Sequence, residues 1–86
     1  MKAVIVYKPE SEMTGKAEGW KKEFEFRTGR KMEVVNPETR EGEGYCTARG
    51  IIDYPAVVVE SENDGKVSFL TQGETLPLFD EVMAYL

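Results

Sequence analysis

The sequence predicts an α/β fold in which three helices flank a four-stranded mixed sheet, in the order βαβ-αββα. Residues 3–7 (AVIVY) and 56–59 (AVVV) are uninterrupted apolar runs, which is the pattern of strands buried on both faces. After residue 11, and again near residue 80, apolar residues recur at helical spacing instead. A chain of 86 residues suffices for one compact core and not for two, so we expect a single domain over residues 1–86.

The first strand is expected at residues 3–7, and a helix follows it up to Thr28. A stripe at helical spacing predicts this helix: Met13, Ala17, Trp20 and Phe24. Either Ser11 or Thr14 can supply the oxygen that caps its first turn. Gly29 is a suitable end, because glycine adopts the left-handed conformation without steric cost.

Residues 31–35 (KMEVV) predict a second strand, which pairs in parallel with the first across a right-handed helical crossover. Asn36 and Pro37 are a good helix start, because asparagine caps and proline needs no N–H at the first helical position. This second helix is expected to end at Gly50. Gly42 and Gly44 weaken it by about 1 kcal/mol each relative to alanine.

The rest of the chain predicts a hairpin and a closing helix. Strands at 56–60 and 66–71 flank residues 61–65 (SENDG), which tolerate the positive φ angles of a tight turn. Thr75 and Pro77 are expected to open the last helix. Its apolar stripe consists of Phe79, Val82, Met83 and Leu86.

Composition excludes several classes of function. The net charge of −5 opposes binding to phosphate backbones, so no nucleic-acid partner is expected. The chain has no histidine, which removes the usual general base and metal ligand, and its single cysteine cannot form an intrachain disulfide. We therefore expect no cofactor and no metal. No apolar run approaches the roughly 20 residues of a membrane span, and the start lacks a secretory pattern, so a cytoplasmic location is expected.

Three segments together resemble the thioredoxin-like fold, and glutaredoxin-sized members in particular. They are residues 4–14 (VIVYKPESEMT), residues 50–59 (GIIDYPAVVV), and residues 66–73 (KVSFLTQG) with the helix that follows. The first is similar to the family's junction between a central strand and a helix, and the second to its cis-proline segment. The resemblance covers nearly the whole chain.

The resemblance also shows a departure. In redox-active relatives the junction carries a Cys-x-x-Cys pair, and alignment through Tyr7-Lys8-Pro9 puts Ser11 and Thr14 at those positions. A helix N-terminus helps a thiol to ionise, but a hydroxyl is far too weak an acid to benefit at neutral pH. Thiol–disulfide exchange also requires sulfur attacking sulfur. We therefore expect a family member without dithiol redox activity.

The resemblance implies a candidate binding corner made of Lys8, Ser11, Thr14, Tyr54 and Pro55. Its hydroxyls and the helix N–H groups would receive an anion or a peptide carbonyl. A cis bond before Pro55 would offer a backbone edge to an extended protein or peptide partner. Lys8 occupies a position where glutathione-binding relatives often carry a lysine, so weak glutathione binding is an alternative. A plainer interpretation is that Ser11 caps the helix and the Tyr54–Pro55 turn only belongs to the fold.

Two further hypotheses use other features. Cys46 is a candidate redox thiol that would act through a mixed disulfide or an intermolecular dimer, although a buried cysteine commonly behaves as a small apolar residue. The chain could instead be a structural or oligomerisation module that uses an exposed sheet edge. A monomer or a weak dimer is expected.

Overall fold

The computed structural model describes residues 1–86 and contains a four-stranded mixed sheet in the order β2-β1-β3-β4. The strands are β1 (Lys2–Val6), β2 (Met32–Val35), β3 (Ala56–Glu60) and β4 (Val67–Gln72), and the helices are α1 (Thr14–Thr28), α2 (Arg40–Arg49) and α3 (Phe79–Met83). β1 pairs in parallel with β2 and antiparallel with β3, which pairs antiparallel with β4. The predicted α/β class and element order are confirmed.

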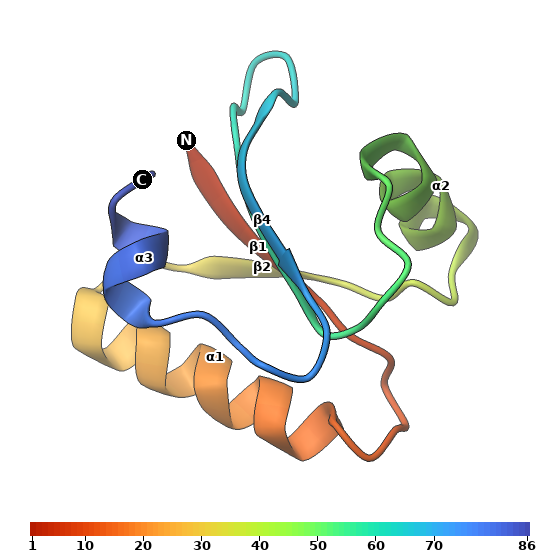
Figure 1. Ribbon diagram of the computed structural model, residues 1–86, viewed down its shortest axis with the longest axis horizontal. Coiled ribbons are helices and arrows are strands. Elements are labelled where there is room, and N and C mark those ends of the chain that lie inside the picture. Colours follow the sequence, from red (N-terminus) through yellow and green to blue (C-terminus); the bar gives the residue numbers. More distant parts are fainter.

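The sheet separates two layers of helices. α1 and α3 cover one face and α2 covers the other (Figure 1). Because side chains alternate along a strand, β1 and β3 contribute to both cores. The core under α1 and α3 contains Ala3, Ile5, Ala17, Phe24, Met32, Val57, Val59 and Val82. The core under α2 contains Val4, Val6, Cys46, Ile51, Ala56 and Val58. This is why both central strands are apolar without interruption.

The stripe predicted for α1 is confirmed, with Ala17 and Phe24 fully buried. The helix ends at Gly29, whose φ of 72° is left-handed as expected. The predicted cap is wrong. Met13 occupies the cap position, and its side chain makes no capping hydrogen bond. The Ser11 and Thr14 hydroxyls do not cap the helix either, because they form hydrogen bonds within the preceding loop.

The second helix begins later than predicted, at Arg40 with Thr39 as its cap. The Asn36 side chain accepts from the Glu38 N–H and its carbonyl accepts from Thr39, so residues 36–39 form a turn instead of a helical start. The Thr39 hydroxyl then accepts from the Gly42 N–H at 2.9 Å. A Cβ at Gly42 would collide with the Asn36 carbonyl, which is why glycine is required inside this helix.

The closing helix is also shorter than predicted, since α3 begins at Phe79 and not at Thr75. The preceding residues run along α1, where the Trp20 indole N–H donates to the Pro77 carbonyl at 3.1 Å. That contact holds the chain extended until Leu78, whose N–H donates to the Glu81 carboxylate in the first turn. None of the helices combines the length and the apolar character needed to cross a lipid bilayer.

Candidate functional site

The loop between β1 and α1 is folded onto the helix start by the Thr14 hydroxyl. This hydroxyl donates to the Lys8 carbonyl at 2.8 Å and accepts from the Ser11 N–H at 2.9 Å. The Ser11 hydroxyl oxygen lies 3.2 Å from that of Thr14. Lys8, Ser11 and Thr14 therefore form one hydrogen-bonded group. Lys8 and Ser11 are exposed, whereas Thr14 is half-buried.

Tyr54 and Pro55 lie in the loop that leads from α2 into β3. The peptide bond between them is cis. Pro55 is fully buried, and its carbonyl accepts from the Gly73 N–H at 3.0 Å, just beyond β4. Tyr54 is half-buried and packs on the core beneath α2.

Lys8 joins the two loops. Its ammonium group lies over the Tyr54 ring at 5.5 Å from the centroid, within the range of a cation–π contact. No hydrogen bond connects the Ser11 or Thr14 hydroxyl with Tyr54 or Pro55. The sequence-predicted residues thus form two groups, and Lys8 bridges them.

The main chain of Tyr54 is unusual in this region, because neither its N–H nor its C=O has a hydrogen-bond partner within the protein. The next pairing of the sheet begins at Ala56, opposite Val6. A half-buried residue just outside a sheet, with both backbone groups free, can bind an extended segment through main-chain hydrogen bonds.

Gln72, at the end of β4, holds this loop in place and was missed by the sequence analysis. Its side-chain oxygen accepts from the Ile52 N–H at 2.8 Å and from the Asp53 N–H at 3.1 Å. Its side-chain nitrogen donates to the Gly50 carbonyl at 3.3 Å. The sequence gives little sign of this role, because a polar residue at the end of a hairpin strand ordinarily faces solvent.

Cys46 lies on α2, behind Tyr54, and is only 4% exposed. Burial raises the pKa of its thiol, and the nearby Tyr54 and Arg49 side chains offset only part of that rise. Burial likewise raises the pKa of the Tyr54 phenol. This environment favours a neutral thiol, which is a poor nucleophile.

The corner is not hollow. The surface has three depressions, of about 600, 530 and 310 Å³, and none is lined by a residue of the corner. No group of cysteine, aspartate or glutamate side chains is arranged to hold a metal ion. The geometry therefore offers a shallow surface with free backbone groups, which suits an extended peptide better than an enclosed small molecule.

A known structure superimposes on nearly the whole chain. The solved structure of thioredoxin 1 from the thermophilic eubacterium Thermosipho africanus TCF52B superimposes with a TM-score of 0.69, over 99% of this chain and 89% of that one. The chain has a thioredoxin-like fold. Identity to that thioredoxin is 12%, so the likeness extends to the fold alone. No protein-family model matches the sequence, and no curated protein matches it.

Within the thioredoxin-like fold, the sole cysteine of this chain stands on α2 and not at the start of α1. Hydroxyls lie instead at residue 11, in the loop before α1, and at residue 14, the first residue of that helix. The chain thus has the thioredoxin-like strand-to-helix junction and a cis-proline loop beside it, without a cysteine in either.

Proposed function

We propose that this chain is a thioredoxin-like binding domain without dithiol redox activity, and that its corner holds an extended segment of a partner protein. The observation that carries the proposal is the main chain of Tyr54, whose N–H and C=O have no partner within the protein. An added strand would satisfy both groups, since main-chain pairing supplies affinity in this mode of recognition.

The side chains around Tyr54 support the same proposal. Lys8 is exposed and has no salt bridge, so its ammonium group is available to a carboxylate or a carbonyl of the bound segment. Ile52 is 80% exposed and gives the segment an apolar contact two residues before Tyr54. A cation and an exposed apolar side chain near the free backbone groups of Tyr54 fit a peptide that carries both acidic and apolar residues.

The absence of dithiol chemistry is supported by the positions of sulfur and oxygen. Ser11 and Thr14 use their oxygens to fold the loop, and oxygen cannot replace sulfur in disulfide exchange. Cys46 is buried with a raised pKa, which disfavours the alternative of a single-cysteine redox protein. Purified protein should not accelerate the reduction of insulin disulfides by dithiothreitol.

Nuclear magnetic resonance tests the binding surface directly. We expect a set of extended ten-residue peptides to shift the amide signals of Lys8, Ser11 and Tyr54, with oxidised glutathione as a separate probe for the small-molecule alternative. Lys8→Glu should weaken binding. Lys66→Glu, the same charge reversal on the exposed β3–β4 hairpin, should leave it unchanged. Shifts confined to α2 or to the outer face of α1 would contradict the proposal.

A further inference from the structure

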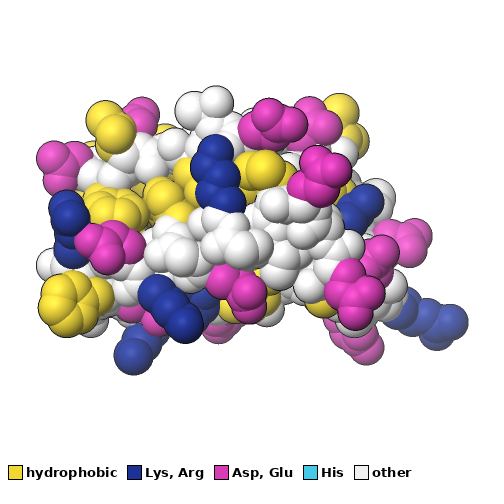
Figure 2. Space-filling model, turned by 90° about the horizontal axis from the view of Figure 1, so that it is seen from below, with side chains coloured by type: hydrophobic (Ala, Val, Ile, Leu, Met, Phe, Trp, Pro, Cys, Tyr) yellow, Lys and Arg dark blue, Asp and Glu magenta, His cyan; other side chains and the backbone are white.

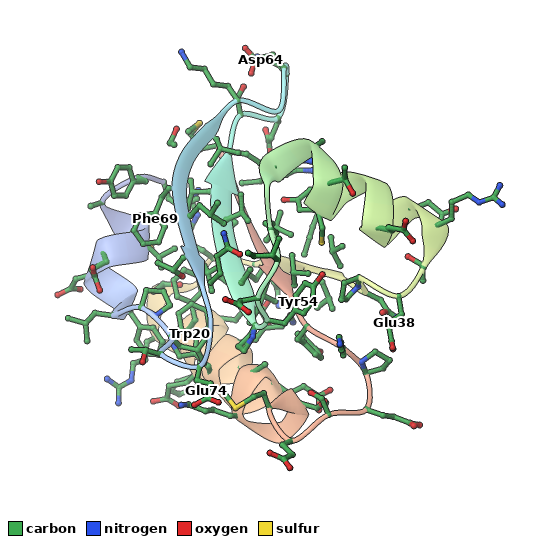
Figure 3. The ribbon with its side chains drawn as sticks, turned by 45° about the vertical axis from the view of Figure 1, so that its right-hand side comes forward. Trp20, Glu38, Tyr54, Asp64, Phe69 and Glu74 are labelled. Atoms are coloured by element: carbon green, nitrogen blue, oxygen red, sulfur yellow. The ribbon has the colours of Figure 1, made fainter.

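A groove runs along α1, between that helix and the chain that leads into α3. It has a volume of about 530 Å³ and is separate from the corner. Its floor is aromatic: the rings of Trp20 and Phe79 lie 5.4 Å apart at 60°. Figure 3 shows Trp20 between α1 and this chain. Because the Trp20 indole N–H donates to the Pro77 carbonyl, the floor is fixed in place.

The open side of the groove exposes apolar surface. Leu78 lines it and is 71% exposed, although it directly precedes a helix that packs on the core. In Figure 2, hydrophobic side chains gather on part of the face that includes α1, with both basic and acidic side chains around them. An exposed leucine beside two aromatic rings is a typical anchor site for an apolar side chain of a partner.

The charge of the groove is opposite to that of the protein. The chain has a net charge of −5, yet the groove is lined by Lys16 and Arg27 and by no carboxylate. Each of the other two depressions includes a glutamate, Glu43 in one and Glu41 in the other. Of the three depressions, only this groove is lined by basic residues without a carboxylate.

Lys16 retains its charge for a ligand, and Arg27 retains unused N–H donors. Lys16 donates to the Glu74 carbonyl at 2.9 Å, a neutral partner that leaves the ammonium charge uncompensated. Arg27 forms a salt bridge from its Nε to Glu23 at 2.6 Å, and the N–H donors of its terminal amino groups have no partner in the protein and can still meet a second carboxylate. The residues are eleven positions apart, close to three helical turns, so they lie on one side of α1 about 16 Å apart along the axis.

We propose that this groove binds an extended, acidic segment of a partner protein. The segment places one or two apolar side chains over Trp20 and Leu78, and its carboxylates meet Lys16 and Arg27. An extended chain advances about 3.3 Å per residue and alternate side chains share a face, so carboxylates six residues apart, about 20 Å, point to the same side as the apolar side chains between them and are within reach of the two long cationic side chains. This surface lies outside the corner, and its occupation does not depend on the function proposed there.

Trp20 makes the proposal directly measurable, because it is the only tryptophan of the chain and it lines the groove. The probe is a synthetic peptide, blocked at both ends, with the sequence Asp-Ser-Leu-Ser-Leu-Ser-Asp, in which both aspartates and both leucines lie on one face of the extended chain. Two matched peptides replace both aspartates with asparagine or with lysine. We expect the acidic peptide to change Trp20 fluorescence in a saturable way, and the lysine peptide to bind at least about tenfold more weakly.

Variants separate the groove from general electrostatic attraction. Lys16→Glu is expected to weaken binding of the acidic peptide about tenfold, and Leu78→Ala is expected to weaken it several-fold. Lys22→Glu is the matched control, since Lys22 is exposed on α1 but does not line the groove. Lys8→Glu, at the corner, should also leave this affinity unchanged, which distinguishes failure here from failure of the corner proposal.

Several outcomes would overturn the inference. One is the absence of any saturable change with the acidic peptide at millimolar concentration. Another is equal affinity for the three peptides, or equal weakening by Lys16→Glu and Lys22→Glu. A third is Trp20 emission that varies with protein concentration alone, together with a dimer in sedimentation, because a second copy of the chain would then cover the groove.

Discussion

Arg49 on α2 donates two hydrogen bonds to Glu60 on β3, from Nε to Oε1 at 2.8 Å and from Nη2 to Oε2 at 3.1 Å. Glu60 is only 2% exposed, and the Tyr45 hydroxyl also donates to it at 2.6 Å. The Arg49 guanidinium in turn lies 3.5 Å from the centroid of the Tyr45 ring. This buried network fastens α2 to the sheet.

Removal of Arg49 should therefore destabilise the protein strongly. Arg49→Met leaves the Glu60 carboxylate buried without its counterion, and we expect a loss of about 3 kcal/mol or more in the free energy of unfolding. Chemical denaturation measures it. Arg40→Met is the control, since Arg40 is exposed on the same helix and forms no salt bridge. Equal losses in the two variants would show that the network contributes little.

Glu25 should make stability depend on pH. The pKa of its carboxyl is held below its ordinary value, first by the hydrogen bond from the Met32 N–H at 2.8 Å and also by Lys21. A lowered folded-state pKa contributes stability that is fully present above the ordinary glutamate value of about 4.3 and is lost as the pH falls through the folded-state value.

Unfolding of Glu25→Gln should accordingly depend less on pH between about 5 and 2 than unfolding of the unmodified protein. Glu23→Gln is the comparison, because Glu23 forms an exposed ion pair two residues away in the same helix. Denaturation midpoints across this pH range measure both. A profile for Glu25→Gln that is as steep as that of the unmodified chain would argue against the assignment.

Cys46 should react slowly with thiol reagents in the folded protein. Its burial both blocks access and raises the thiol pKa, so modification is expected to be slow at neutral pH and to become rapid on unfolding. Ellman's reagent, with and without denaturant, gives the two rates. Rapid modification of the native protein near neutrality would instead support the redox hypothesis for this residue.

Cysteines placed at residues 11 and 14 should form a disulfide with each other. The hydroxyl oxygens there are 3.2 Å apart, so sulfur atoms in the same places need little movement to bond. We expect Ser11→Cys with Thr14→Cys, in a Cys46→Ala background, to lose both free thiols on mild oxidation without forming a disulfide between two chains. The single variants are controls, and intermolecular disulfides in the double variant would contradict this geometry.

Gln72 should govern the order of the loop before Pro55. Gln72→Ala removes the acceptor of the Ile52 and Asp53 N–H groups, and their hydrogen exchange should accelerate about tenfold for a hydrogen bond worth roughly 1 kcal/mol or slightly more. Gln72→Glu keeps an acceptor oxygen and should retain most of the protection. Unchanged exchange in Gln72→Ala would mean that other contacts hold the loop.

Regular periodicity made the fold predictable. Burial follows from the position of an element in the sheet as a whole, and it leaves a pattern over many residues. The apolar runs of β1 and β3 and the apolar stripe of α1 are such patterns, and they indicate which faces are buried. Element starts were less predictable because they depend on single contacts. The side chain of Asn36 caps a turn in place of α2, and the contact of Trp20 with Pro77 delays α3.

The candidate site was only partly predictable, because it too depends on single contacts between residues far apart in the sequence. A resemblance could indicate Lys8, Ser11, Thr14, Tyr54 and Pro55 as a set, and the structure joins Lys8 both to Thr14 and to the Tyr54 ring. Gln72 could not be found in this way, because its partners lie about 20 residues away in the sequence and are backbone groups without a side-chain signature.

The close approach of Gly42 to Asn36 has a consequence at a distance. Because there is no room for a side chain at that point, a Cβ at residue 42 would displace α2 from the turn. A slip by a single residue would rotate the helix by about 100° and swing Arg49 away from Glu60. An alanine at residue 42 is thus expected to weaken the ion pair between Arg49 and Glu60 at the other end of α2, as well as to disturb the turn at Asn36.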